Sequence, residues 1–136
     1  MKLQIAFWVL LLITGLSASA QTANAPAEGT TMNCTLTFSD TQKTIHNPTE
    51  ADMRAALNAS NNNDAVGPVF QITFEASTES LQVDLNDKNQ FSFDYSDGQN
   101  ASVSKRNDFS LDEALKVLVA FSNRAADWKK MVEWQN

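Results

Sequence analysis

The sequence predicts an α+β domain, in which an antiparallel sheet meander is packed on one face by a capped C-terminal helix and is accompanied by a second, short helix. Two observations predict this fold. Three consecutive segments alternate apolar and polar side chains, as strands with one dry and one wet face do: residues 70–75, 81–86 and 91–95. A capping box at Ser110 then opens a segment with helical spacing. The meander needs a cover for its dry face, and this helix supplies one.

The domain opens with a strand at residues 32–38, because Met32, Cys34, Leu36 and Phe38 alternate with polar side chains. A turn follows, and residues 43–46 return as a short partner strand. Pro48 stops this strand, and Thr49 is a suitable N-cap for a short helix over residues 50–59. The asparagine-rich run after this helix competes for backbone hydrogen bonds and is expected to end it.

The three alternating segments form the central meander, because their links are short and rich in turn residues. The last link contains Asp97-Gly98, a pair that favours a tight hairpin turn. A fourth strand is expected at residues 100–105. It is weaker than the others, since only Ala101 and Val103 are apolar there.

The covering helix is expected over residues 110–123, with Ser110 as N-cap and Glu113 reaching back to it. Its apolar arc is broad enough to lie on a sheet and consists of Leu111, Ala114, Leu115, Leu118 and Phe121 or Ser122, widened by Val117 and Val119. The tail at residues 128–134 fits either a strand or a helix, and we interpret it as a final strand. The sheet then has five to seven strands, with the shorter helix at one end.

The first 20 residues have the features of a secretory signal peptide that is cut after Ala20. Lys2 precedes an uncharged apolar run of 12 residues, and Ala18-Ser19-Ala20 supplies the small residues that signal peptidase reads. The run is short for a membrane span, which takes about 20 residues. We therefore expect a periplasmic or secreted protein without a stable membrane anchor. Residues 21–31 form a flexible leader, and residues 32–136 form a single α+β domain.

The charge argues against nucleic acid or anionic lipid as the main partner. The 136-residue chain has 16 acidic and 10 basic side chains, and removal of Lys2 with the signal peptide takes the net charge from −6 to −7. The single cysteine, Cys34, cannot form a disulfide within the chain. Its place in the alternating pattern favours a buried thiol, with an intermolecular disulfide or a reactive thiol as alternatives.

The residue types needed for catalysis or for metal binding are scarce, so we expect no enzyme activity, no cofactor and no metal site. His46 is the only histidine. A dyad of Cys34 and His46 on paired strands is conceivable, but Cys34 belongs to the face predicted to be buried. A zinc site would need three or four ligands with a recognisable spacing.

Acidic side chains in or beside consecutive strands are the remaining candidates for a functional site. A solvated surface, a protein-binding patch and a hydrolytic carboxylate pair are all compatible with them. As a candidate partner-binding surface we take Glu75, Glu79, Asp84, Asp87, Asp94 and Asp97.

The order of these elements resembles a bacterial family, immunity protein one of polymorphic toxin systems. The resemblance covers about residues 46–136. It rests on three local patterns in this order: Asn47-Pro48-Thr49-Glu50 before the first helix, the meander with Phe93-Asp94-Tyr95-Ser96-Asp97-Gly98, and Leu111-Asp112-Glu113-Ala114-Leu115 leading through Phe121 to Val132-Glu133-Trp134. The resemblance implies an α+β fold, no catalysis, and binding and neutralisation of a cognate toxin.

The leading hypothesis is therefore an exported, non-enzymatic protein that binds another protein, by resemblance an immunity-type protein whose acidic surface meets a basic toxin domain. One alternative is a small periplasmic carrier that holds an apolar ligand between sheet and helix. Another is an uncharacterised secreted α+β domain. A carboxylate hydrolase is a further alternative, and it would need two carboxyl groups in one concave site.

Overall fold

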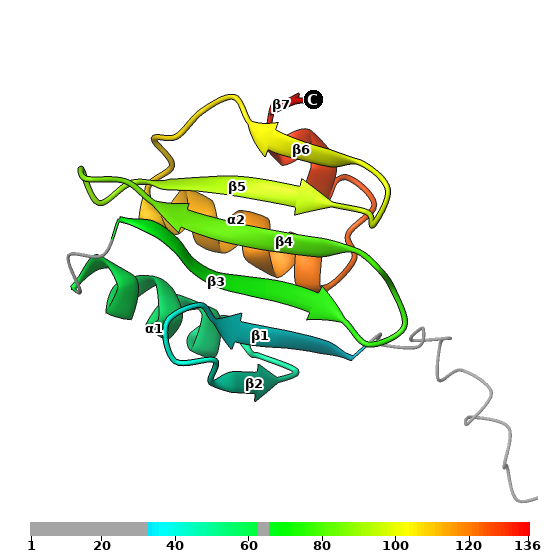
Figure 1. Cartoon of the computed structure of the whole chain (residues 1–136), viewed down its shortest axis with the longest axis horizontal. Helices are drawn as coiled ribbons and strands as arrows, with labels where there is room; N and C mark the ends of the chain where they lie inside the picture. The colour runs from blue at the N-terminus through cyan, green and yellow to red at the C-terminus, as the bar shows by residue number, and fades with distance from the viewer. Residues whose placement is uncertain (1–32, 63–65) are drawn as a thin grey trace, which may run out of the picture. The chain divides into compact units, whose positions relative to one another are not determined.

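The computed structural model describes residues 33–62 and 66–136, which form an antiparallel seven-stranded sheet with two α-helices on one face (Figure 1). The strands lie side by side in the order β2-β1-β3-β4-β5-β6-β7. Their bounds are β1 (Cys34–Phe38), β2 (Thr44–His46), β3 (Gly67–Phe74), β4 (Ser80–Leu85), β5 (Phe91–Ser96), β6 (Ala101–Ser104) and β7 (Trp134–Gln135). The predicted α+β fold is confirmed. The predicted signal peptide (residues 1–20) and leader (residues 21–31) lie outside the described residues.

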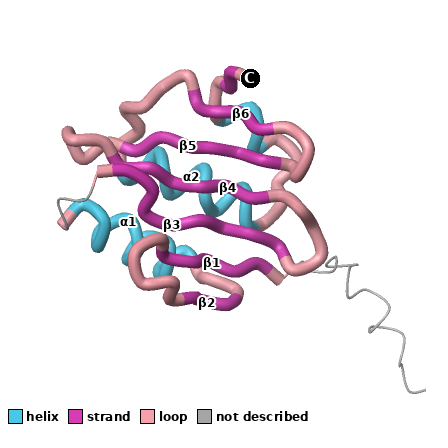
Figure 2. Tube along the Cα trace, in the orientation of Figure 1, coloured by secondary structure: helices cyan, strands magenta, loops and turns pink. Residues whose placement is uncertain are grey.

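The alternating segments form strands in the predicted way, with one buried side chain in every two. In register across the sheet, Leu36 pairs with Ile72, and Ile72 pairs with Leu81. All three side chains are fully buried. In the view of Figure 2 both helices lie behind the sheet. Because these three side chains are buried, they belong to the face of the sheet that the helices cover.

The two helices are α1 (Glu50–Asn61) and α2 (Leu111–Ser122), and each begins at the predicted cap. The Thr49 hydroxyl accepts a hydrogen bond from the Asp52 amide at 3.2 Å. At α2 the Ser110 amide donates to the Glu113 carboxylate at 2.9 Å. None of the described helices has the length and hydropathy to cross a membrane.

The predicted second helix is present and begins at residue 50 as expected, but it extends to Asn61, past the predicted end at residue 59. Helix α1 has 12 residues, as many as α2, and covers the same face of the sheet beside it. It continues past Ala59 because the buried Ser60 hydroxyl donates to the Ala56 carbonyl at 2.8 Å and so remains satisfied inside the helix. An ion pair at 3.2 Å between Arg54 of α1 and Asp112 of α2 joins the two helices.

The prediction of a single strand at residues 128–134 is wrong. The segment forms a 3-10 helix, η2 (Trp128–Met131), and only Trp134 and Gln135 pair with the sheet, as β7. The Trp128 ring centroid lies 4.8 Å from that of Phe121 and 5.1 Å from that of Tyr95. The 3-10 turn buries Trp128 while Lys130 stays in water, whereas a strand would turn both side chains to the same face.

Candidate functional site

The face of the sheet that the helices leave uncovered carries small and polar side chains. Alternation in the strands sends one set of residues to this open face, which is turned toward the viewer in Figure 1. The seven strands contain no lysine or arginine, and Asp84 and Asp94 are their only carboxylates. The central part of the open face consists of Thr35, Thr37, Gln71, Thr73, Ser80, Gln82, Asp84, Ser92, Asp94, Ser96, Ala101 and Val103.

Strand register brings Asp84 and Asp94 close together on the open face. Gln82 of β4 pairs with Asp94 of β5, and Asp84 pairs with Ser92, so the two carboxylates occupy neighbouring positions on adjacent strands. The Gln82 side-chain amide donates to Asp84 Oδ2 at 3.1 Å. Partial burial, and in addition the charge of Asp84, raise the pKa of Asp94. A cation bound beside this pair would relieve the repulsion between the carboxylates.

Two of the other predicted acidic residues are engaged within the protein. The Glu79 carboxylate accepts from the Tyr95 hydroxyl at 2.9 Å and from Arg124 Nη2 at 2.7 Å. The Asp97 carboxylate accepts from the backbone amides of Gln99 and Asn100 at 2.9 and 2.7 Å, and these bonds lower its pKa. Both carboxylates therefore stabilise the fold directly.

The six predicted residues do not form one continuous surface. Glu75, Glu79 and Asp97 follow or precede strand ends on one side of the sheet, where β3 and β5 end and β4 begins. Asp87 lies in the β4–β5 turn at the opposite end. The structure brings only Asp84 and Asp94 together on the open face. The Arg124–Glu79 ion pair had no local sequence signal, because its partners are 45 residues apart.

Cys34 and His46 lie on opposite faces of the sheet. Cys34 is 6% exposed among core side chains, as its place in the alternation predicted, and burial raises the pKa of its thiol. His46 is exposed, and its Nδ1 lies 3.2 Å from the Thr35 hydroxyl, which belongs to the open face. The two side chains therefore form no dyad. Within residues 33–62 and 66–136 no group of three or more potential metal ligands comes together.

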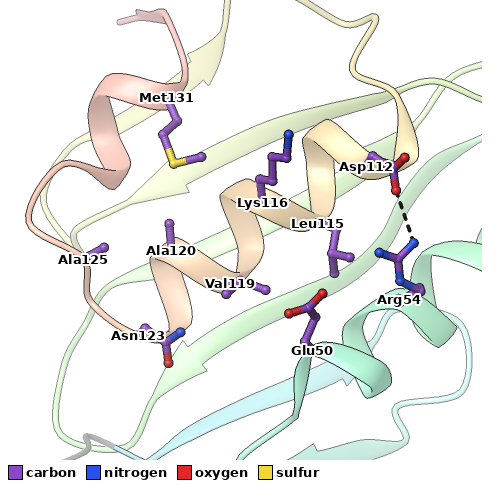
Figure 3. A pocket seen from close by; sticks show the side chains of 10 residues that line it. All are labelled: Glu50, Arg54, Asp112, Leu115, Lys116, Val119, Ala120, Asn123, Ala125 and Met131. Atoms are coloured by element: carbon purple, nitrogen blue, oxygen red, sulfur yellow. Dashed lines mark hydrogen bonds and ion pairs between the residues drawn. The ribbon is translucent and has the colours of Figure 1, made fainter.

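A groove lies along the outer side of α2, away from the sheet, with α1 on one side and η2 on the other (Figure 3). Its volume is about 690 Å³. Its lining consists of Glu50, Arg54, Asp112, Leu115, Lys116, Val119, Ala120, Asn123, Ala125 and Met131. No local pattern in the sequence predicts this groove. The one related signal is the breadth of the α2 apolar arc, which Val119 extends beyond the part that the sheet covers.

The strand aromatics do not line this groove. Phe70, Phe91 and Phe93 have no exposed surface, and the Phe93 ring packs 5.1 Å from the Phe109 ring, centroid to centroid. The carrier hypothesis placed an apolar ligand beside these rings, between sheet and helix. The space that the groove offers lies instead on the outer side of the helix layer.

The chain matches no family model, no curated protein and no solved structure. The chemistry of the two surfaces therefore has to be argued from the residues themselves. The open face presents hydroxyl and amide groups around two carboxylates, and the groove presents apolar side chains beside charged ones.

Proposed function

We propose that this protein is exported, has no catalytic activity and binds a basic protein partner on the open face of its sheet, as a toxin-neutralising immunity protein would. One observation carries the proposal. Within residues 33–62 and 66–136 no helix covers one broad face of the sheet, and the strands contain two carboxylates and no lysine or arginine. The resemblance of about residues 46–136 to immunity protein one also supports a protein-binding function.

The shape and composition of the open face suit a protein partner. A specific interface covers about 800 Å² on each partner, and the open face extends across the whole width of the seven-stranded sheet. Short side chains such as Thr37, Ser92 and Ser96 lose little conformational entropy when a partner covers them. Such a face supports recognition through many small polar contacts, with the partner supplying the larger anchoring side chains.

Charge decides which kind of protein fits. Asp84 and Asp94 attract lysine or arginine, and the acidic excess of the whole chain accelerates association with a basic partner. A second copy of this chain on the same face would set its own carboxylates against these two, which is unfavourable. Glu75 and Asp87 lie beyond the strand ends and act from the rim of the face, while Glu79 and Asp97 remain in their internal contacts.

The test uses the toxin domain that we expect to be encoded beside this gene. Calorimetric titration should give a complex whose affinity falls with rising salt, and co-expression should restore growth of cells that make the toxin domain. Exchange of Asp84 and Asp94 together for asparagine should weaken binding at least tenfold, because both anchoring charges are lost. Asp127→Asn is the matched control, since Asp127 is an exposed carboxylate beside η2, and it should change the affinity less than twofold.

Two results would contradict the proposal. One is a gene neighbourhood without any toxin domain. The other is a complex that the Asp84/Asp94 double exchange weakens no more than Asp127→Asn does. Export is tested separately, by the N-terminal sequence of the protein recovered outside the cytoplasm. That sequence should begin at Gln21.

A further inference from the structure

The groove along α2 has two chemically different halves (Figure 3). Val119, Ala120, Ala125 and Met131 line one half together with the polar Asn123, and Met131 is 41% exposed. Four charged side chains line the other half: Glu50, Arg54, Asp112 and Lys116. Val119, Ala120 and Ala125 are half-buried against the core, and Met131 is the exposed side chain among them. A solvent-facing helix side normally carries polar residues, so this half offers an apolar surface that an occupant would cover.

The charges in the polar half balance, with two carboxylates against two cations. Arg54 and Asp112 form an ion pair, but their side chains are 47% and 76% exposed, so the pair is weak and open to exchange. Among the described residues Glu50 and Lys116 take part in no ion pair. The polar half can therefore receive one positive and one negative group at the same time.

We propose that the groove binds a zwitterionic amphiphile with a single acyl chain, of the kind that carries a phosphocholine or phosphoethanolamine headgroup. The phosphate lies by Lys116 and Arg54, the ammonium lies by Glu50 and Asp112, and the chain covers the apolar half. The volume of about 690 Å³ lies within the usual range for small-molecule sites, about 300–1,000 Å³. The inference is independent of the proposed function, because the open face lies on the other side of the sheet.

The balance of charges in the polar half favours a zwitterionic headgroup over anionic, cationic and neutral ones. An anionic headgroup would pair with Lys116 and leave Glu50 uncompensated, and a cationic one would pair with Glu50 and leave Lys116 uncompensated. A neutral headgroup would leave both Glu50 and Lys116 without a partner. Met131 suits an acyl chain because its flexible, polarisable thioether adapts to irregular apolar surfaces.

The experiment titrates the exported protein, labelled with ¹³C at its methionine methyl groups, with dodecylphosphocholine below its micellar concentration. The Met131 signal, assigned with Met131→Leu, should move saturably. The Met53 signal should stay in place, because that side chain is buried at the inner side of α1. Decylphosphocholine should bind about fifteenfold more weakly, since it is two methylenes shorter and each buried methylene contributes about fourfold to affinity. Dodecyl sulfate, dodecyltrimethylammonium and dodecyl maltoside, at the same concentrations, should bind more weakly than dodecylphosphocholine.

Charge and shape variants complete the test, with calorimetry as the readout. Lys116→Glu should weaken dodecylphosphocholine binding about fivefold. Met131→Glu should abolish it, because it puts a charge in the apolar half. Lys130→Glu makes the same charge change next to Met131 on a residue outside the groove lining, and should leave the affinity unchanged.

Four results would overturn the proposal: no saturable shift at Met131, equal binding of the maltoside, equal effects of Lys116→Glu and Lys130→Glu, or a dimer of the ligand-free protein that Met131→Glu dissociates. The last result would mean that a second copy covers the groove. Circular dichroism spectra of the variants establish that each is folded before its affinity is compared.

Discussion

The two faces of the sheet are made by alternate residues of the same strands, yet they have opposite properties. On the helix side Phe91, Phe93 and Leu81 are fully buried. On the open side their neighbours Ser92, Gln82 and Asp94 remain in contact with water. Because successive side chains of a strand point to opposite faces of the sheet, each strand contributes to both the core and the open face. The inward residues stabilise the fold, and the outward residues are available for recognition.

The largest expected effect contrasts a buried apolar side chain of helix α2, which packs on the covered face, with an apolar side chain of the open face. Phe121→Ala should lower the free energy of unfolding by about 3–5 kcal/mol, because the ring is 1% exposed and packs against Phe74 and Trp128. Val103→Ala should change it by about 0.5 kcal/mol or less, since Val103 is 40% exposed on the open face. Urea denaturation measures both. If the two variants lost similar amounts of unfolding free energy, the open face would contribute as much to stability as the core, which would contradict the comparison.

The next effect concerns the β5–β6 turn, which sets the register that keeps the two faces apart. Gly98 has a φ of +92°, and a Cβ atom there would come within 2.5 Å of Thr78 side-chain atoms. Gly98→Ala should therefore cost about 2 kcal/mol or more. Gly67→Ala is the matched control, since φ is +119° but a Cβ atom has open space around it, and should cost about 1 kcal/mol. If both variants lost the same unfolding free energy, the Thr78 side chain would move away from the new Cβ atom at no cost.

A smaller effect is the pH-dependent change in the free energy of unfolding when a carboxylate is replaced by an amide. Its sign should differ between Asp94 on the open face and Glu113 on the helix side. On the open face the pKa of Asp94 is raised, so the folded protein holds this proton more tightly than the unfolded chain does. Ionisation of Asp94 therefore destabilises the fold at neutral pH, and the penalty disappears as the pH falls below the ordinary aspartate pKa. Asp94→Asn should raise the free energy of unfolding at pH 7 by about 0.5 kcal/mol or less. The gain should vanish near pH 3. A loss of stability at pH 7 would contradict this prediction.

On the helix side Glu113 should behave in the opposite way. Hydrogen bonds from Ser110 lower the pKa of its carboxyl group, so the ionised form stabilises the folded state above the ordinary glutamate pKa. This contribution is lost as the pH falls through the lowered pKa. Glu113→Gln should therefore reduce stability at pH 7 and make no difference at strongly acidic pH. Thermal unfolding between pH 2 and pH 7 measures both variants, and a gain at pH 7 for Glu113→Gln would be inconsistent with the capping contact.

The sheet and the covering helix could be predicted because their signals are local. Alternation located β3, β4 and β5, and the Ser110–Glu113 box located the start of α2. The tail could not be assigned, because Trp128 and Trp134 face the core in a strand and in a 3-10 turn alike. Their environment decides between these structures. The Trp128 ring packs against Phe121 and Tyr95 at centroid distances of 4.8 and 5.1 Å. These three rings come together only in the folded chain.

The candidate surfaces were predictable only in part. Alternation predicts that Asp84 and Asp94 share a face. It does not predict the ion pair between Arg124 and Glu79, because these residues are 45 positions apart in the sequence. The groove depends on the relative placement of α1, α2 and η2. Met131, its most exposed apolar side chain, lies in the tail segment whose spacing fits either a strand or a helix. Tertiary packing creates both features, so local spacing alone does not reveal them.

The sheet ends in very short strands, with three residues in β2 and two in β7. Few backbone amides and carbonyls are therefore left at its borders for an incoming strand. A partner has to recognise side chains on the open face instead of extending the sheet. Each of these side chains can be exchanged without repacking the interior, so binding specificity can diverge from one homologue to another while the fold remains intact.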